Sequence, residues 1–274
     1  MLKAPSWKFL LPIILVALLL RVNGIQHYGL WGDEQASMQV ATGQRYVEDT
    51  ISTYTNLQLR STDRFSGVIR STINDNGNSV LYNVALHYWI GVFGRSDLAA
   101  RSLSLLFGIC LILVAFRFTE VLTGSLSAAY LAAAFLAFHP LVVGYAQEAR
   151  AYSMALLFSL LSSLFLLEGM SRKVGWAKFF YLYLATLIVA LLSHYLVVYV
   201  LGAQLIVVAI GLREKRKWML LCGGLLVVLV VIGLWFRVGG VQGLQVLRDQ
   251  NQMHRLQAEA YRSGDPPYAL PVDP

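Results

Sequence analysis

Two adjacent carboxylates, Asp33 and Glu34, follow the first apolar run of this chain, within the stretch GLWGDEQASM at residues 29–38. In a partly desolvated site a carboxylate has a raised pKa, so it can accept a proton from a hydroxyl or amine nucleophile. The same acids could instead bind a divalent metal ion, pair with a neighbouring cation, or cap the helix expected at EQASMQVA. The local sequence leaves these roles open.

A second polar group lies in the stretch YAQEARAY at residues 145–152. Arg150 stands near the start of an apolar run, where an arginine is costly unless it has a partner. Gln147 lies three residues earlier on the same helical face, and Glu148 forms a second such pair with Tyr152. Guanidinium binds phosphate oxygens bidentately, so Arg150 could hold a lipid-linked phosphate or diphosphate. A structural ion pair with Glu148 or with an acid of the first loop is an equal alternative.

Two further sites could touch an anionic ligand. His194, followed by Tyr195, lies between two apolar runs. It could donate to a phosphate or ligate a metal, and a His-Tyr pair in an interfacial aromatic belt is an equal alternative. Arg101 is expected to anchor the outer end of its apolar run, and it too could reach an anionic headgroup.

The segment 79–92, SVLYNVALHYWIGV, is short for a helix that crosses a bilayer. Its polar residues recur every four positions, which places Ser79, Asn83 and His87 on one side of an otherwise apolar helix. This pattern is typical of a helix that lies in the membrane interface.

The elements that must position these residues are apolar helices. Of the 274 residues, 57% are hydrophobic and only 14% are charged, whereas soluble domains carry about 25% charged residues. We therefore predict an all-α, polytopic transmembrane helical bundle with about seven spans over residues 1–236, followed by a polar, Pro-containing tail at 237–274. The expected spans are 7–25, 98–116, 126–144, 150–167, 176–192, 194–212 and 217–236. The first is expected to remain uncleaved, with Arg21 snorkelling to the interface.

The basic residues predict the sidedness of this bundle. The net charge is +7, but many Lys and Arg residues lie in short connectors between apolar runs, which argues against a nucleic-acid partner. Placing the N-terminus in the cytoplasm puts these connectors inside. The long first loop, 26–97, with its interfacial helices, and the tail then lie outside. All the polar groups described above fall on that outer face. Cys110 and Cys222 lie within apolar segments and are expected to be packing residues.

Four stretches in this order resemble the membrane glycosyltransferases of the GT-C type. They are the acidic pair after the first span, LYNVALHYWIGVFGRSDLAARSLSLLFG, YAQEARAYSMALL and SHYLVVYVL. The nearest resemblance is to family 39, the protein-mannosyltransferase-like and aminoarabinose-transferase-like enzymes of bacteria. It extends to about residue 236. Relatives often carry a Pro-Pro turn where this chain has NGNSVLYN, and they are usually longer.

The resemblance implies transfer of a sugar, with inversion, from a polyprenyl-phosphate donor to a lipid, glycan or protein acceptor. The reaction would take place at the outer face of the bacterial cytoplasmic membrane. Asp33 would be the carboxylate that activates the acceptor, with Glu34 supporting it or binding a substrate. Arg150 and His194 would hold the donor phosphate.

Two other classes of protein remain open. A lipid-headgroup-binding transporter or flippase could use the same polar cluster, although transporters typically show internal repeats and broken helices near the midplane. The sequence shows no such repeat, and its polar residues gather at one face. A non-catalytic partner subunit of another transferase is the third possibility.

Overall fold

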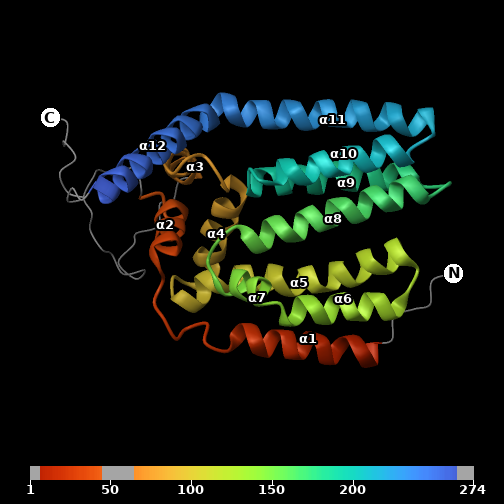
Figure 1. Ribbon diagram of the computed structural model, residues 1–274, viewed down its shortest axis with the longest axis horizontal. Coiled ribbons are helices and arrows are strands. Elements are labelled where there is room, and N and C mark those ends of the chain that lie inside the picture. Colours follow the sequence, from red (N-terminus) through yellow and green to blue (C-terminus); the bar gives the residue numbers. More distant parts are fainter. Residues whose placement is uncertain (1–6, 45–64, 264–274) are drawn as a thin grey trace.

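The structure is a computed structural model that describes residues 7–44 and 65–263. Every regular element in these ranges is a helix, which confirms the predicted all-α class (Figure 1). The helices are α1 (Trp7–Val22), α2 (Gly32–Ala41), α3 (Phe65–Asn74), α4 (Val80–Phe93), α5 (Asp97–Thr123), α6 (Leu126–Phe138), α7 (Pro140–Gln147), α8 (Tyr152–Ser171), α9 (Trp176–Ser193), α10 (Val197–Gly211), α11 (Lys215–Trp235), the π-helical turn η1 (Phe236–Gly240) and α12 (Val241–Ser263).

Within the described residues, four helical segments are long and apolar enough to cross a membrane. They are α5, α8, α9 and the continuous stretch 215–245, and α6 with α7 would make a fifth. The prediction of about seven spans is therefore not confirmed. The expected span 194–212 is shortened because its first residues form a turn, so that α10 begins at Val197. The expected span 126–144 is broken at Pro140, where the chain bends by 58°.

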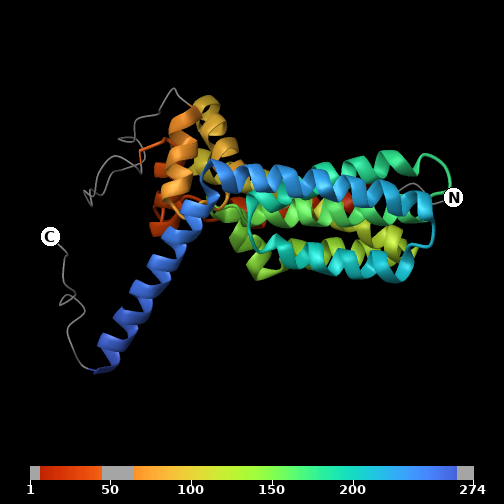
Figure 2. The same ribbon diagram turned by 90° about the horizontal axis from the view of Figure 1, so that it is seen from above.

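Most of the helices run lengthwise, side by side, as an elongated bundle (Figures 1 and 2). In its middle, α8 packs against α5 on one side and α9 on the other. The shorter helices α2, α3 and α4 gather at one end, and α12 leaves the bundle there at an oblique angle (Figure 2). Large apolar side chains remain exposed along the outer helices, for example Leu131, Phe135, Ile206 and Leu229. This surface is compatible with a lipid bilayer.

A network of charged residues lies at the other end of the bundle. Arg117 contacts Glu168 at 3.1 Å, and Arg172 contacts the same carboxylate at 2.6 Å. Lys217, whose side chain is almost fully buried, donates to the carbonyl oxygens of Met170 and Arg172. These bonds tie the ends of α5 and α8 to the start of α11. Arg117 and Lys217, which were expected in basic connectors, lie within α5 and α11, whereas Arg172 directly follows α8.

Arg21 does not snorkel to the interface as expected, because its side chain is completely buried. Its guanidinium donates to the carbonyl oxygens of Leu136 and Ala137, each at 3.0 Å, and to that of Ala17 at 3.1 Å. In a continuous helix the Leu136 carbonyl would accept from the residue four positions later, which is Pro140 and has no N–H. Arg21 therefore supplies the hydrogen bond that Pro140 cannot make.

Replacing Arg21 by Met tests this role. The change leaves two buried carbonyl oxygens at the α6–α7 break without their donor, which costs about 1–3 kcal/mol for each. We expect a clear fall in the thermal unfolding midpoint of the purified protein in detergent. Arg255→Met, at an exposed position of α12, is the control and should leave the midpoint unchanged. Equal midpoints for the two variants would contradict the role given to Arg21.

Candidate functional site

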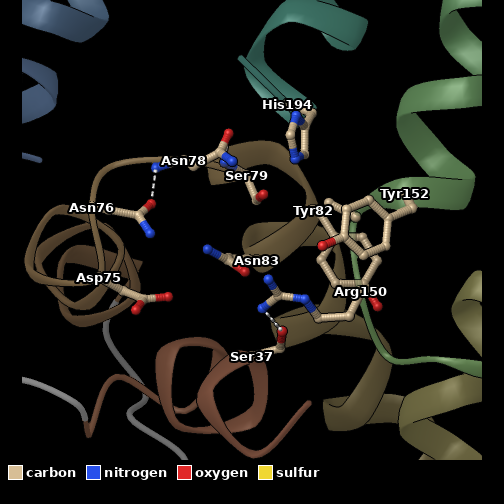
Figure 3. A pocket seen from close by; sticks show the side chains of 11 residues that line it. Ser37, Asp75, Asn76, Asn78, Ser79, Tyr82, Asn83, Arg150, Tyr152 and His194 are labelled. Carbon is tan, nitrogen blue, oxygen red and sulfur yellow. Dashed lines mark hydrogen bonds between the residues drawn. The ribbon is translucent and has the colours of Figure 1, made fainter. Parts of the chain in front are cut away.

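A polar pocket lies where the gathered short helices meet the end of the bundle (Figure 3). Its lining comes from α2, the turn between α3 and α4, α4, the segment before α8, and the turn after α9. The lining residues are Ser37, Asp75, Asn76, Asn78, Ser79, Tyr82, Asn83, Arg150, Ala151, Tyr152 and His194. Three of the residues predicted as substrate-binding, Asn83, Arg150 and His194, thus meet in one pocket.

The turn DNGNS, residues 75–79, forms one wall of the pocket. Asn76, Gly77 and Ser79 have φ angles of 76°, 69° and 62°, in the left-handed region that asparagine and glycine tolerate best. The Asn76 side-chain oxygen accepts from the Asn78 N–H at 3.1 Å. The Asn78 side-chain oxygen accepts from the N–H groups of Ser79 at 2.9 Å and Tyr195 at 3.1 Å. The side-chain amides therefore close the turn and fix it to the turn after α9.

Asp33, the predicted base, does not line the pocket itself but lies next to Arg150, which does. The Arg150 guanidinium donates to the Asp33 carbonyl oxygen at 3.1 Å, and its Nη2 lies 3.5 Å from the Asp33 carboxylate. The Asp33 side chain is 50% exposed and that of Arg150 is 25% exposed. The structure thus brings the predicted base and the predicted phosphate ligand together, and both remain accessible.

Glu34 is placed very differently from its neighbour. Its buried carboxylate accepts from Arg101 Nε at 2.8 Å and Nη2 at 2.6 Å. It also accepts from the N–H of Ala149 at 2.7 Å and from that of Trp31 at 3.2 Å, the latter closing the N-terminus of α2. The remaining donors of Arg101 bind the carbonyl oxygens of Ile25, Tyr28 and Gly29. Glu34 and Arg101 thus use their hydrogen-bonding atoms on each other and on nearby backbone groups, and neither residue lines the pocket.

This buried pair determines where the pocket residues lie. Asp33 directly precedes Glu34 in the chain, and Arg150 directly follows Ala149. The bond from the Ala149 N–H to Glu34 joins the two segments. The accessible pair therefore stands beside the buried one and takes its position from it.

Glu148 lies close to these charges but outside the pocket lining. Burial raises the pKa of its carboxyl, and the neighbouring charges of Glu34 and Asp33 raise it further, against the opposing effect of Arg150 and Arg101. Its side chain makes no hydrogen bond or ion pair within the part of the chain that the structure describes. Glu148 therefore keeps a proton to a higher pH than an ordinary glutamate.

His194 faces the pocket as a neutral ring. Burial lowers the pKa of its imidazole, and the charge of Arg150 lowers it further. Its Nδ1 accepts the Leu196 N–H at 3.2 Å, which leaves Nε2 to carry the proton. The ring packs 5.7 Å from that of Tyr152, centroid to centroid. His194 can therefore donate one hydrogen bond to a ligand in the pocket.

Besides Glu148 and Arg101, three further residues predicted to bind substrate lie outside this lining. Gln147 donates to the carbonyl oxygens at the end of α1, His87 bonds to the Ala41 carbonyl at 2.8 Å, and the Tyr195 hydroxyl donates to that of Gly77. Each holds two elements together around the pocket.

Sequence reasoning missed several residues of the site. Ser37 follows Asp33 by one helical turn on α2 and binds the Arg150 guanidinium at 3.3 Å. Asp75 and Asn76 belong to a run of turn-forming residues directly before the predicted interfacial helix. This run of turn-forming residues is the sequence feature from which the pocket wall could have been predicted.

The start of α12 supports the same wall. Gly243 packs so closely on the turn that a Cβ atom there would lie 2.5 Å from the Gly77 nitrogen and 2.6 Å from the Asn76 carbonyl carbon. The sequence predicted only a polar tail from 237 onward, yet residues 241–263 form a helix. Residues 264–274 of that tail, and residues 45–64 of the predicted first loop, lie outside the described residues.

The possible divalent metal has no candidate cluster in the described parts of the chain. Within residues 7–44 and 65–263, no group of three or more His, Cys, Asp or Glu side chains could hold an ion.

The comparisons with known proteins give no match. No protein-family model, curated protein or solved structure matches this chain. The resemblance to GT-C glycosyltransferases therefore rests on the order of its motifs alone.

Glu34→Gln tests the buried pair. Removing the charge leaves Arg101 buried without a compensating anion, which typically costs about 3–5 kcal/mol. We expect a large fall in the thermal unfolding midpoint in detergent. Asp33→Asn, one residue away, removes an exposed charge and should change the midpoint little. A similar loss in the two variants would argue against the distinction between the two acids.

Gly243→Ala tests the packing of α12 on the pocket wall. The added methyl group meets backbone atoms of residues 76 and 77, so the turn or the helix must shift. We expect faster limited proteolysis and a lower unfolding midpoint. Gly233→Ala on α11 is a matched control, because a Cβ atom there meets nothing within 4 Å. The packing role fails if Gly243→Ala behaves like this control.

Proposed function

We propose that this chain is an integral-membrane glycosyltransferase of the GT-C type. It moves a sugar, with inversion, from a polyprenyl-phosphate donor to a lipid, glycan or protein acceptor. The observation that carries this proposal is the pairing of an accessible carboxylate, Asp33, with an accessible guanidinium, Arg150, which lines a polar pocket on one end of an apolar bundle. An acid and a cation side by side match the two demands of this reaction, a base for the acceptor and a charge for the leaving phosphate.

The residues have complementary tasks in the transfer step. The Asp33 carboxylate takes the proton of the acceptor hydroxyl while the acceptor oxygen forms its bond to the anomeric carbon of the sugar. The bond from that carbon to the phosphate oxygen breaks, and its electrons pass to the leaving phosphate. Arg150 stabilises this developing charge, and His194 adds a neutral hydrogen bond through Nε2.

The other lining residues suit the sugar. Asn76, Ser79 and Asn83 offer amide and hydroxyl groups that can donate to and accept from sugar hydroxyls. The Tyr152 ring, packed against those of Tyr145 and His194, offers an apolar face. The apolar outer surface of the bundle suits a polyprenyl chain.

The distribution of basic residues supports a location for this chemistry. The end of α5, the turn after α8 and the start of α11, which carry Arg117, Arg172 and Lys217, lie at the end of the bundle opposite the pocket. With that end in the cytoplasm, the pocket faces the outer side of the bacterial cytoplasmic membrane. The N-terminus is then inside.

A lipid-headgroup-binding transporter or flippase is the second candidate. One observation favours it, the break of 58° between α6 and α7, because discontinuous helices are common in transporters. Movement of a labelled polyprenyl phosphate between the leaflets of a proteoliposome, without sugar transfer, would identify this activity. A non-catalytic partner subunit would show neither sugar transfer nor movement of the polyprenyl phosphate between leaflets.

Asp33→Asn tests the glycosyltransferase directly. We expect turnover to fall by about 10²–10⁴-fold, the usual contribution of a general base, while the unfolding midpoint stays near that of the wild type. The measurement is transfer of labelled sugar from a panel of polyprenyl-phosphate sugars to bacterial membrane acceptors by the reconstituted protein.

The control for this experiment is Asp249→Asn on α12, an exposed acid away from the pocket. It should keep full turnover. Transfer by the Asp33 variant at the rate of the wild type would remove Asp33 from the role of base.

A further inference from the structure

The two terminal nitrogens of Arg150 have different partners. Nη1 donates to the Asp33 carbonyl oxygen at 3.1 Å and to the Ser37 hydroxyl at 3.3 Å. Ser37 donates to the same carbonyl oxygen, also at 3.1 Å. Within the described residues, the ion-pair partner of Nη2 is the Asp33 carboxylate at 3.5 Å. One side of the guanidinium is thus held by the backbone and hydroxyl of α2, and the other side by a loose ion pair.

The neighbouring pair shows how loose this contact is. Glu34 and Arg101 meet at 2.6 and 2.8 Å with side-chain exposures of 0% and 7%, close to the usual length of a charge-assisted hydrogen bond. Asp33 and Arg150 are separated by 3.5 Å with exposures of 50% and 25%. An exposed pair of this geometry contributes little to stability. The Asp33 carboxylate can therefore leave Nη2 at small cost.

The residues that line the pocket offer an entering anion few cationic partners besides Arg150. Among the described residues that line it, Arg150 is the only lysine or arginine, and Asp75 adds a carboxylate. His194 is held neutral by burial and by Arg150, so it supplies a hydrogen bond without a charge. A phosphate group in this pocket therefore has to use the same guanidinium that Asp33 now faces.

We propose that the Asp33 carboxylate and a substrate phosphate compete for Nη2 of Arg150. Phosphate binding displaces Asp33 from the arginine and leaves its carboxylate facing the pocket. Rotation of the Asp33 side chain is sufficient, because Nη1 stays bound to the backbone of α2. This inference rests on the proposed function for the identity of the ligand. Its consequence is that the carboxylate of the base is released from its cationic neighbour when the donor is bound.

The competition predicts that removing the charge of Asp33 strengthens binding of the phosphate. The experiment uses the full chain in lipid nanodiscs, with farnesyl phosphate as the probe and titration calorimetry as the measurement. Asp33→Asn should bind farnesyl phosphate about two- to five-fold more tightly than the wild type, a ratio typical of losing one partly exposed ion pair. Asp249→Asn on α12 is the matched control and should bind like the wild type.

A second pair of variants tests whether the gain passes through Arg150. In an Arg150→Gln background, Asp33→Asn should give no gain in affinity. In an Arg150→Lys background, which keeps the cation, part of the gain should remain. The unfolding midpoint of each variant is measured to verify that it is folded.

Three results would overturn the proposal. Unchanged or weaker binding by Asp33→Asn would contradict the competition while leaving the glycosyltransferase proposal in place. An equal gain in the Arg150→Gln background would assign the effect to general repulsion between anions. If the wild type and all variants fail to bind farnesyl phosphate, both the polyprenyl-phosphate donor and this inference fail.

Discussion

The buried ion pair between Glu34 and Arg101 is the interaction on which the pocket end of this protein depends. Taking two charges out of water costs several kcal/mol for each, and only close contacts with further hydrogen bonds offset that cost. Here one carboxylate accepts from the guanidinium and from two backbone N–H groups, and the guanidinium also binds three backbone carbonyls. The pair thereby fixes the end of α1, the start of α2 and the approach to α8 in one arrangement.

The same pair explains how two neighbouring acids acquire different properties. Successive residues of a helix point about 100° apart, so that when Glu34 faces the interior of the bundle, Asp33 points in another direction, beside Arg150. The buried carboxylate of Glu34 is fully bonded, whereas the exposed carboxylate of Asp33 makes only a 3.5 Å ion pair. The sequence raised helix capping and catalysis as alternatives for the pair. The structure places Glu34 at the cap and leaves Asp33 accessible.

The sequence predicted the helical class, because apolar runs are properties of the chain itself. Of the predicted site residues, Arg150 and His194 line one pocket, and Asp33 lies beside Arg150. The positions of Gln147, His87 and Tyr195 outside the pocket lining could not be predicted, since each bonds to a backbone carbonyl of a segment distant in the sequence. The count of seven spans was not confirmed, because α1 and α10, with 16 and 15 residues, are shorter than the predicted spans, and because Pro140 breaks another. Helix α12 was missed because its composition is polar and its contact with the pocket depends on glycines.

The bond between Arg21 and the broken helix has a consequence for biogenesis. Irregular backbone within a membrane is tolerated only where protein or water satisfies its polar groups. Two carbonyl oxygens of the α6–α7 break accept from Arg21, so the break has these donors only when α1 lies beside it. Since the chain is synthesised from its N-terminus, α1 is made before α6, and Arg21 is already present when the broken helix forms.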